Sequence, residues 1–155
     1  MKEIERDEIT IVGIKLNEKT SNIDNRSQLD IGNLWERFEK ENITSQIPTK
    51  KNNDIVAVYF DYDGDYREPF SYLIGFEVSI LEKVPVGLTK ITIPQSKYLK
   101  FTARGKMPDC ISETWQTIWK TKVERAYKYD IERYSEKSWN KINSEDDIFI
   151  SIGQD

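Results

Sequence analysis

Two amphipathic helical patterns of the same kind, 80 residues apart, constrain the fold of this 155-residue chain more than any other feature. In residues 28–40 the apolar positions recur at helical spacing and form one stripe, made of Ile31, Leu34, Trp35 and Phe38. Residues 108–120 carry a similar stripe, made of Ile111, Trp115, Ile118 and Trp119. The alignment of Trp35 with Trp115 favours an internal duplication. Any α+β protein has helices with apolar stripes, so chance similarity stays open as the alternative.

Predicted strands surround each helix in the same order. Alternating, β-branched segments predict strands at residues 9–16, 55–60, 70–80, 89–93, 98–103, 126–134 and 147–152. A Pro- and Gly-bearing break at residues 83–87 separates two groups of elements. The pattern predicts one α+β domain over residues 1–155, with two strand-helix-strand-strand repeats at about 1–82 and about 88–155. Two such halves related by a pseudo-two-fold axis leave a central cleft, where ligand pockets commonly lie.

Charge and hydropathy restrict the partners and the compartment. The chain carries 23 Lys and Arg against 27 Asp and Glu, a net charge of −4, so we expect no direct binding to nucleic acid. No apolar run approaches the roughly 20 residues that cross a bilayer, and the polar first residues do not form a signal peptide. We therefore expect a cytoplasmic protein without membrane contact. The single cysteine, Cys110, cannot form an internal disulfide, which agrees with a reducing compartment.

The absence of histidine excludes most familiar hydrolytic mechanisms. Without an imidazole the chain has no Ser-His or Cys-His nucleophile pair and no His-rich zinc site. The spacing of Asp61, Asp63 and Asp65 imitates the first half of a calcium-binding loop, but the later glycine and glutamate of that loop do not follow. Cys110 is expected to be a buried structural thiol. The residues therefore predict no metal, no cofactor and no catalytic group.

Residues 128–134 (KYDIERY) place Glu132 among tyrosines, shortly after the second helical stripe. A carboxylate beside aromatic rings is typical of pockets for cationic, ring-bearing molecules, because ring faces attract cations and a partly desolvated carboxylate pairs with them strongly. The alternative is an ordinary two-faced strand whose face with Glu132 and Tyr134 is solvated. Lys128 and Arg133 flank Glu132, so the residues alone leave the charge preference of the site open.

Six short segments, in this order, resemble the GyrI-like (AraC-type) effector-binding domain family, and within it the integron-associated branch. They are residues 72–78 (YLIGFEV), 84–87 (VPVG), 93–101 (IPQSKYLKF), 105–108 (GKMP), 114–119 (TWQTIW) and 129–134 (YDIERY). The similarity spans almost the whole chain, and the order and spacing of the segments are more specific than any single one. The resemblance implies two strand-helix-strand-strand repeats around a central ligand cleft. It also implies binding of drug-like, often cationic and lipophilic molecules, by a stand-alone domain or by the sensor of a transcription regulator.

The resemblance also implies candidate binding residues. The ligand-pairing acid of the family falls on Glu132 in the penultimate strand, and Tyr134 lies two positions on, hence on the same strand face. Glu77 occupies the acid position of the first half, where it either lines the cleft from the opposite side or lies at the surface. Candidates for the aromatic walls are Tyr59, Tyr72, Trp115 and Trp119. Core packing beneath the sheet is the alternative for at least one of the two tryptophans.

Three functions stay open at this point. The leading interpretation is a domain that binds aromatic or lipophilic cations and serves transcription regulation or drug sequestration. A gene-regulatory role requires a separate DNA-binding partner, since no DNA-reading segment is recognised. The second interpretation is hydrolysis of reactive electrophiles, as reported for some GyrI-like proteins, with Glu132 or Glu77 as general base. The third is a protein-interaction module, which the densely charged composition disfavours.

Overall fold

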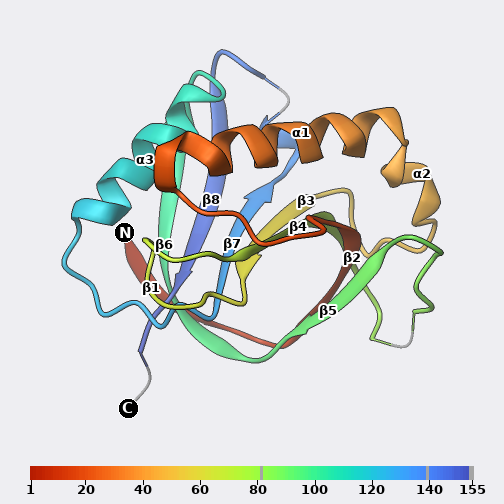
Figure 1. The fold of residues 1–155 in the computed structure, drawn as a ribbon, viewed down its shortest axis with the longest axis horizontal. Helices are drawn as coiled ribbons and strands as arrows, with labels where there is room; N and C mark the ends of the chain where they lie inside the picture. Colours follow the sequence, from red (N-terminus) through yellow and green to blue (C-terminus); the bar gives the residue numbers. More distant parts are fainter. Residues whose placement is uncertain (81, 139, 154–155) are drawn as a thin grey trace.

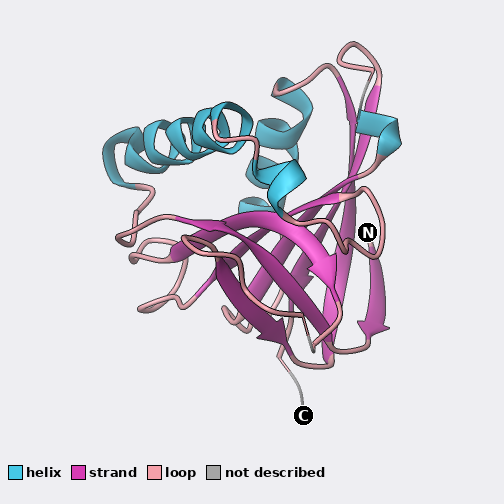
Figure 2. Cartoon of the chain, turned by 90° about the vertical axis from the view of Figure 1, so that its right-hand side faces the viewer, coloured by secondary structure: helices cyan, strands magenta, loops and turns pink. Residues whose placement is uncertain are grey.

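The structure, a computed structural model, describes residues 1–80, 82–138 and 140–153. Within these residues, one antiparallel sheet of eight strands curls on itself, and two long helices cover one of its faces (Figure 1, Figure 2). The strands are β1 (Lys2–Arg6), β2 (Ile9–Lys15), β3 (Ile55–Phe60), β4 (Ser71–Val78), β5 (Thr89–Ile93), β6 (Ser96–Gly105), β7 (Tyr129–Tyr134) and β8 (Ser144–Ser151). The helical elements are η1 (Ile23–Asn25), α1 (Arg26–Lys40), α2 (Ile43–Gln46), α3 (Asp109–Lys120) and η2 (Glu136–Ser138). The predicted α+β class is confirmed.

The two predicted repeats join into one continuous sheet. The strand order across it is β1-β6-β8-β7-β3-β4-β2-β5, so the units β2-α1-β3-β4 and β6-α3-β7-β8 lie side by side. Their junction is the antiparallel pair of β3 and β7, where Ala57 lies opposite Glu132. The predicted order of elements is therefore confirmed, and the pseudo-two-fold axis passes through this junction.

The outermost strands cross over between the halves. β1, at the start of the chain, pairs with β6 of the second unit, with Ile4 opposite Tyr98. β5, which leads into the second unit, pairs with β2 of the first, with Ile91 opposite Ile11. β1 lies outside the predicted strands because its sequence, KEIER, is polar apart from Ile4, a composition typical of edge strands.

The predicted element bounds agree with the structure at 55–60 and 89–93 and differ by a few residues elsewhere. β8 begins at Ser144 rather than at residue 147, and β7 begins at Tyr129 rather than at residue 126. Tyr127 has a φ of 52°, which interrupts the extended backbone just before the strand. α2 is a single turn in a polar segment without a helical pattern, so the sequence does not predict it.

Alternation along the strands divides the core between the two faces of the sheet. Under α1, Ile74 and Phe76 pack against Leu34 and Phe38. α3 covers the second half of the sheet, where its apolar side chains contact Phe101, Ile148 and Ile150. The opposite face closes on its own side chains, which are Ile11, Val56, Val58, Leu73, Ile93, Tyr98, Ile131 and Phe149. Because both faces are tightly filled, the sheet forms a rigid base for the side chains under the helices.

β2 and β4 approach closely at two facing glycines. Gly13 lies opposite Gly75 in the strand ladder. A Cβ atom placed at Gly75 would lie 2.1 Å from the carbonyl oxygen of Val12, and one placed at Gly13 would lie 2.0 Å from that of Ile74. Only glycine fits such a close approach, so this pair permits the tight curl of the sheet.

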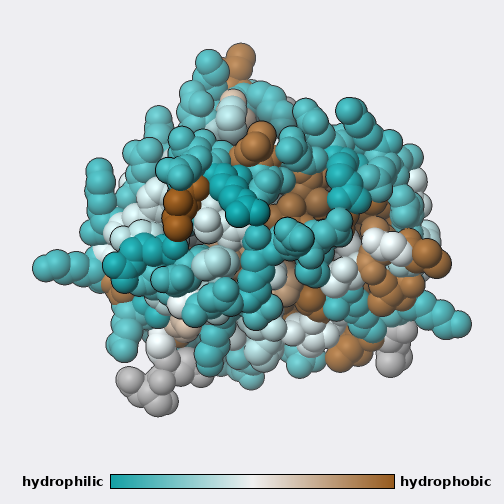
Figure 3. Space-filling model, in the orientation of Figure 1, coloured by the Kyte–Doolittle hydropathy of each residue, from teal (hydrophilic) through white to brown (hydrophobic). Residues whose placement is uncertain are grey.

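The exterior agrees with the charged composition. The face seen in Figure 3 is mostly hydrophilic, with hydrophobic residues showing in small groups between polar ones. In the part of the chain that the structure describes, no helix combines the length and apolar character needed to cross a membrane.

Candidate ligand-binding site

A cavity of about 530 Å³ lies between the two long helices and the strands at the junction of the repeats. Its main walls are Ile31 and Trp35 of α1, Ile111 and Ser112 of α3, and Tyr59, Tyr72, Glu132 and Tyr134 of the sheet. This volume is within the range of small-molecule pockets. The cavity lies where the sequence predicts a central cleft.

Glu132 lies at the sheet side of this cavity and is only 2% exposed. Three aromatic side chains donate hydrogen bonds to its carboxylate. The hydroxyl of Tyr59 and Nε1 of Trp115 donate to Oε2 over 2.9 Å and 2.6 Å, and the hydroxyl of Tyr134 donates to Oε1 over 2.7 Å. Because the donors come from β3, α3 and β7, they fix the orientation of the carboxylate. The alternative of a solvated strand face is therefore wrong.

The electrostatics of Glu132 differ from those of the other acids on the central strands. Burial raises the pKa of Glu132 above its ordinary value, although the hydrogen bonds from Tyr134, Trp115 and Tyr59 oppose this shift. Among the described residues, no lysine or arginine forms an ion pair with Glu132, whereas Asp130 and Glu77 each have an arginine partner. The cavity therefore contains a buried acid that lacks a cationic partner.

The tyrosines around Glu132 are held in their neutral form. Burial, and then the charge of Glu132, raise the pKa values of Tyr59 and Tyr134 well above 10. Burial and the same charge also raise the pKa of Tyr72. The Tyr72 hydroxyl accepts a hydrogen bond from Nε1 of Trp35 over 3.0 Å. The hydroxyls of Tyr59 and Tyr134 therefore keep their protons at neutral pH and act as donors to the carboxylate.

Aromatic rings gather around the carboxylate. The ring centroid of Tyr59 lies 4.8 Å from that of Tyr72 and 5.1 Å from that of Trp115. The rings of Trp35 and Tyr134 also meet edge to face, with centroids 5.5 Å apart. Flat rings around one acid can hold a cation electrostatically and a ring system by contact.

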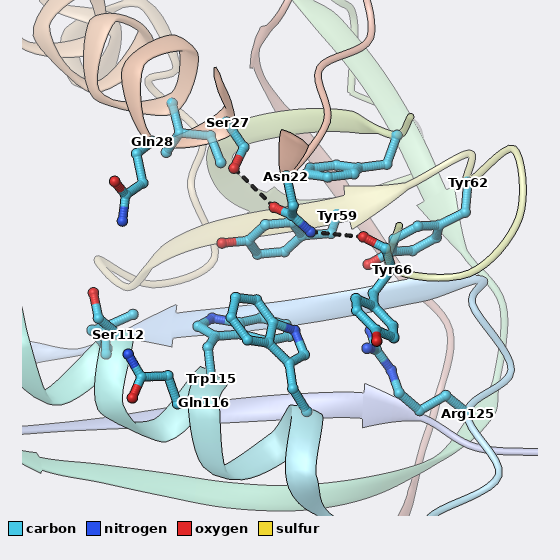
Figure 4. Close-up of a pocket in the computed structure, with 14 residues that line it drawn as sticks. Asn22, Ser27, Gln28, Tyr59, Tyr62, Tyr66, Ser112, Trp115, Gln116 and Arg125 are labelled. Atoms are coloured by element: carbon cyan, nitrogen blue, oxygen red, sulfur yellow. Dashed lines mark hydrogen bonds between the residues drawn. The ribbon is translucent and has the colours of Figure 1, made fainter. Parts of the chain in front are cut away.

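A smaller cavity of about 200 Å³ adjoins the first (Figure 4). The two cavities share the lining residues Gln28, Ile31, Tyr59, Ile111 and Ser112. Trp115, which is 9% exposed, and Trp119, which is 46% exposed, both line the smaller cavity. Trp119 stacks on Tyr66 with ring centroids 6.3 Å apart. Trp115 therefore joins the core to Glu132, while Trp119 lies at the rim of the smaller cavity.

Glu77 does not reach either cavity, so its expected place in the cleft is corrected. Its neighbour Phe76 faces α1, and strand alternation turns Glu77 to the opposite face of the sheet. There its carboxylate accepts a hydrogen bond from Arg133 over 3.1 Å, and Arg133 also donates to Asp54 over 2.9 Å. The same alternation directs Arg133 away from Glu132, although the two are adjacent in sequence. Arg133 therefore does not neutralise the cavity acid.

Similarity to known proteins identifies the family. Residues 4–152 match the family described as Cass2, integron-associated effector binding protein. The chain belongs to this family. The resemblance to the integron-associated branch is therefore confirmed, and membership in the Cass2 family makes small-molecule binding the function class of this chain.

Individual relatives agree with the Cass2 assignment. The transcriptional regulator BrlR of Pseudomonas aeruginosa is 30% identical over 129 residues, which are 79% of this chain and 46% of that protein. The integron cassette protein VCH_CASS2 of Vibrio cholerae has a TM-score of 0.77 at 22% identity, covering 98% of this chain and 95% of its own. SAV2435, solved with tetraphenylphosphonium bound, has a TM-score of 0.80 at 19% identity, covering 98% and 93%. The chain thus spans about half the length of BrlR. VCH_CASS2 and SAV2435 share the fold of this chain.

Trp35 is a wall residue that the Cass2-like motifs do not single out. It lies on α1, outside the six segments that carry the resemblance, but it lines the larger cavity. The signal that points to it is the duplication, which aligns it with Trp115. Each of these tryptophans donates its indole N–H to a side chain of the cavity, Trp35 to Tyr72 and Trp115 to Glu132.

Other reactive groups lie apart from the cavity or are inert. Cys110 is 3% exposed, and burial raises the pKa of its thiol, as expected of a structural cysteine. The aspartates whose spacing imitates part of a calcium-binding loop pair with basic side chains of the chain: Asp63 accepts a hydrogen bond from Lys19 over 2.6 Å. Within the described residues, no three His, Cys, Asp or Glu side chains form a group that would hold a metal ion.

Proposed function

We propose that this protein binds aromatic, lipophilic cations in its larger cavity and that Glu132 pairs with the positive charge of the ligand. The observation that carries this proposal is a buried carboxylate that is oriented by three aromatic donors and has no cationic partner among the described residues. Tyr59, Tyr72, Trp35 and Tyr134 supply the ring-lined walls.

The energy of such a pairing depends on where the carboxylate lies. An ion pair at the surface contributes about 0–1 kcal/mol, because water solvates and screens both charges. Glu132 has already lost its hydration on folding, so a ligand cation restores favourable electrostatics to a group that folding has desolvated. The surrounding ring faces add cation–π attraction. Charge and contact area therefore favour the same class of ligand.

The preference among cations follows from the shape of the walls. Flat rings accept many ring systems, since they provide contact area without a fixed pattern of polar groups. Small hydrated cations gain little from such walls and lose their water on entry. We therefore expect broad binding of ring-bearing cations and weak binding of ammonium or alkali ions.

The relatives support this ligand class and a regulatory role. SAV2435, which shares the fold, has been solved with the aromatic cation tetraphenylphosphonium. BrlR is a transcriptional regulator, and the chain matches about half of its length. We propose that ligand binding by this chain serves regulation together with a DNA-binding partner.

Titration with tetraphenylphosphonium tests the proposed function. The expected result is saturable quenching of tryptophan fluorescence and a melting temperature that rises with the logarithm of ligand concentration. Tetraethylammonium, which has the same charge and no rings, is the control and should bind much more weakly. Absence of binding by a panel of aromatic cations would contradict the proposal.

A further inference from the structure

The smaller cavity contains an arginine whose hydrogen-bonding capacity is only partly used. The side chain of Arg125 is 6% exposed and lines this cavity. Its Nη2 donates to Oδ2 of Asp130 over 2.8 Å, but Nε and Nη1 are buried and have no hydrogen-bond partner in the part of the chain that the structure describes. Buried N–H groups are nearly always paired, because an unpaired one loses its hydrogen bonds to water without replacement.

Asp130 cannot supply the missing acceptors. Its Oδ2 already accepts from the hydroxyl of Tyr62 over 2.6 Å as well as from Arg125. Its Oδ1 accepts from the backbone N–H and the hydroxyl of Ser151, over 2.9 Å and 3.2 Å. The carboxylate is thus shared among four donors, and it leaves Nε and Nη1 of Arg125 without an acceptor among the described residues.

The guanidinium is held in place without closing the cavity. Its Cζ lies 4.3 Å from the ring centroid of Tyr127 and 5.9 Å from that of Trp115. Figure 4 shows the side chain of Arg125 below Tyr66 and extending toward it. Burial is the largest single effect and lowers the pKa of Arg125, but the interactions with Asp130, Tyr62 and Tyr127 together outweigh it and leave the pKa raised, so the group is always charged. The result is a fixed, charged donor at one end of a hollow lined by rings.

Trp115 links this donor to the cavity acid. Its Nε1 lies 2.6 Å from Glu132, and its ring also faces the guanidinium of Arg125. The two cavities share five lining residues, so one molecule can extend along this indole from the larger cavity into the smaller one. The two ends of such a molecule meet opposite charges, an acid at one end and a guanidinium at the other.

We propose that the cavity beside Arg125 is a second subsite, which binds an acceptor oxygen, such as a carboxylate or carbonyl, of the ligand whose cationic part pairs with Glu132. This inference rests on the proposed function and adds to it a ligand class. The preferred ligands are aromatic cations that also carry an acceptor group, and simple aromatic cations fill only the larger cavity.

Two matched phosphonium probes test the subsite. (4-Carboxybutyl)triphenylphosphonium and pentyltriphenylphosphonium have the same cation and similar length, but only the first carries a carboxylate. In the unmodified protein we expect the carboxylated probe to bind at least about tenfold more tightly, as one charge-assisted hydrogen bond provides. It should also shift the Nε–H and Nη–H resonances of Arg125, which are assigned through the bonds of its side chain in isotope-labelled, unmodified protein, whereas the pentyl probe should not shift them.

The variant Arg125→Lys retains a positive charge for Asp130 but removes the placed Nε and Nη1 donors. It should reduce the preference for the carboxylated probe to less than about threefold. The matched control is Arg133→Lys, since Arg133 is also largely buried and ion-paired but lies on the opposite sheet face. This control should keep the full preference.

The outcomes separate the subsite from the proposed function. If the pentyl probe binds and the carboxylated probe has no advantage, the subsite is refuted and the proposed function stands. An advantage that persists in a folded Arg125→Lys protein, or that leaves the Arg125 resonances unshifted, also refutes the subsite. If Arg125→Lys does not fold, the resonances of the unmodified protein decide. If neither probe binds, both the proposed function and this inference fail.

Discussion

The indole nitrogen of Trp115 donates a hydrogen bond to the carboxylate of Glu132 over 2.6 Å, and this contact joins the apolar face of α3 to the floor of the larger cavity. Trp115 lies 17 residues before Glu132 in sequence. The helix that fills the core of the second repeat thus also orients the acid of the candidate site. A change in the packing of α3 would therefore alter the electrostatics of the cavity as well as the stability of the fold.

Replacing Glu132 by Gln should weaken the binding of tetraphenylphosphonium at least about tenfold, roughly 1.4 kcal/mol, because it removes the charge and keeps the shape. Isothermal titration calorimetry measures the affinity, and the melting temperature should change little. Glu77→Gln is the matched control, since Glu77 lies on the other sheet face and is paired with Arg133. Equal affinities of Glu132→Gln and the unmodified protein would remove Glu132 from the site.

The affinity of the protein for tetraphenylphosphonium should rise with pH across the acidic range. The raised pKa of Glu132 means that the folded protein loses this proton at a higher pH than the unfolded chain does. As pH rises from the ordinary value of 4.5 through the raised value, the carboxylate ionises and cation binding strengthens. The contribution of Glu132 to the free energy of unfolding falls over the same window, because the unfolded state binds fewer protons there.

Calorimetry in buffers of different ionisation enthalpy measures the protons released on binding, and urea unfolding at several pH values measures the stability. In Glu132→Gln, neither the affinity for the cation nor the stability should show this dependence on pH. An affinity that is flat from pH 4 to pH 8 in the unmodified protein would show that the acid is fully ionised throughout.

Replacing Trp35 by Leu should weaken the binding of tetraphenylphosphonium by about three- to tenfold. The substitution removes a ring from the cavity wall, and a cation–π contact contributes about 0.5–2 kcal/mol, depending on how far the cation is desolvated. Trp119→Leu is the control, because Trp119 is half-exposed and lines only the smaller cavity. Fluorescence titration gives both affinities. If Trp119→Leu has the larger effect, the cation lies in the smaller cavity.

Asp130→Asn should destabilise the protein by about 3–5 kcal/mol, since it leaves the charge of Arg125 buried without compensation. Chemical unfolding followed by circular dichroism measures the change. Glu145→Gln, which removes an acid from surface pairs with Arg104 and Lys137, should lower the stability far less, because water screens these charges. Similar small losses for both variants would mean that water reaches the Arg125–Asp130 pair.

Much of the fold follows from local sequence patterns. The two helices were predictable because each apolar stripe extends over several turns, and Glu132 and Tyr134 share a face because strand side chains alternate. The same alternation carries Glu77 and Arg133 to the other face, but this depends on which strand residues lie under the helices. Packing against α1 determines which residues of β4 face the helices. The position of a single acid in a strand does not indicate this.

The remaining features of the site depend on pairings between distant segments. Arg125 and Tyr62 meet at Asp130 only because β7 lies beside β3, and no local pattern brings a turn after β3 to the residues before β7. Trp35 reaches Tyr72 across 37 residues. Such contacts follow from the order of the strands in the sheet, and no local pattern in the sequence indicates that order.

The crossing of β1 and β5 has a consequence for how the duplicated chain behaves. A fragment ending near residue 82 would carry β1 without β6, and the complementary fragment would carry β5 without β2, so each would expose an unsatisfied strand edge. The halves are therefore interdependent, and they should unfold in a single cooperative transition. Only reassociation of the two fragments would restore both edges and, with them, the hollow between the helices.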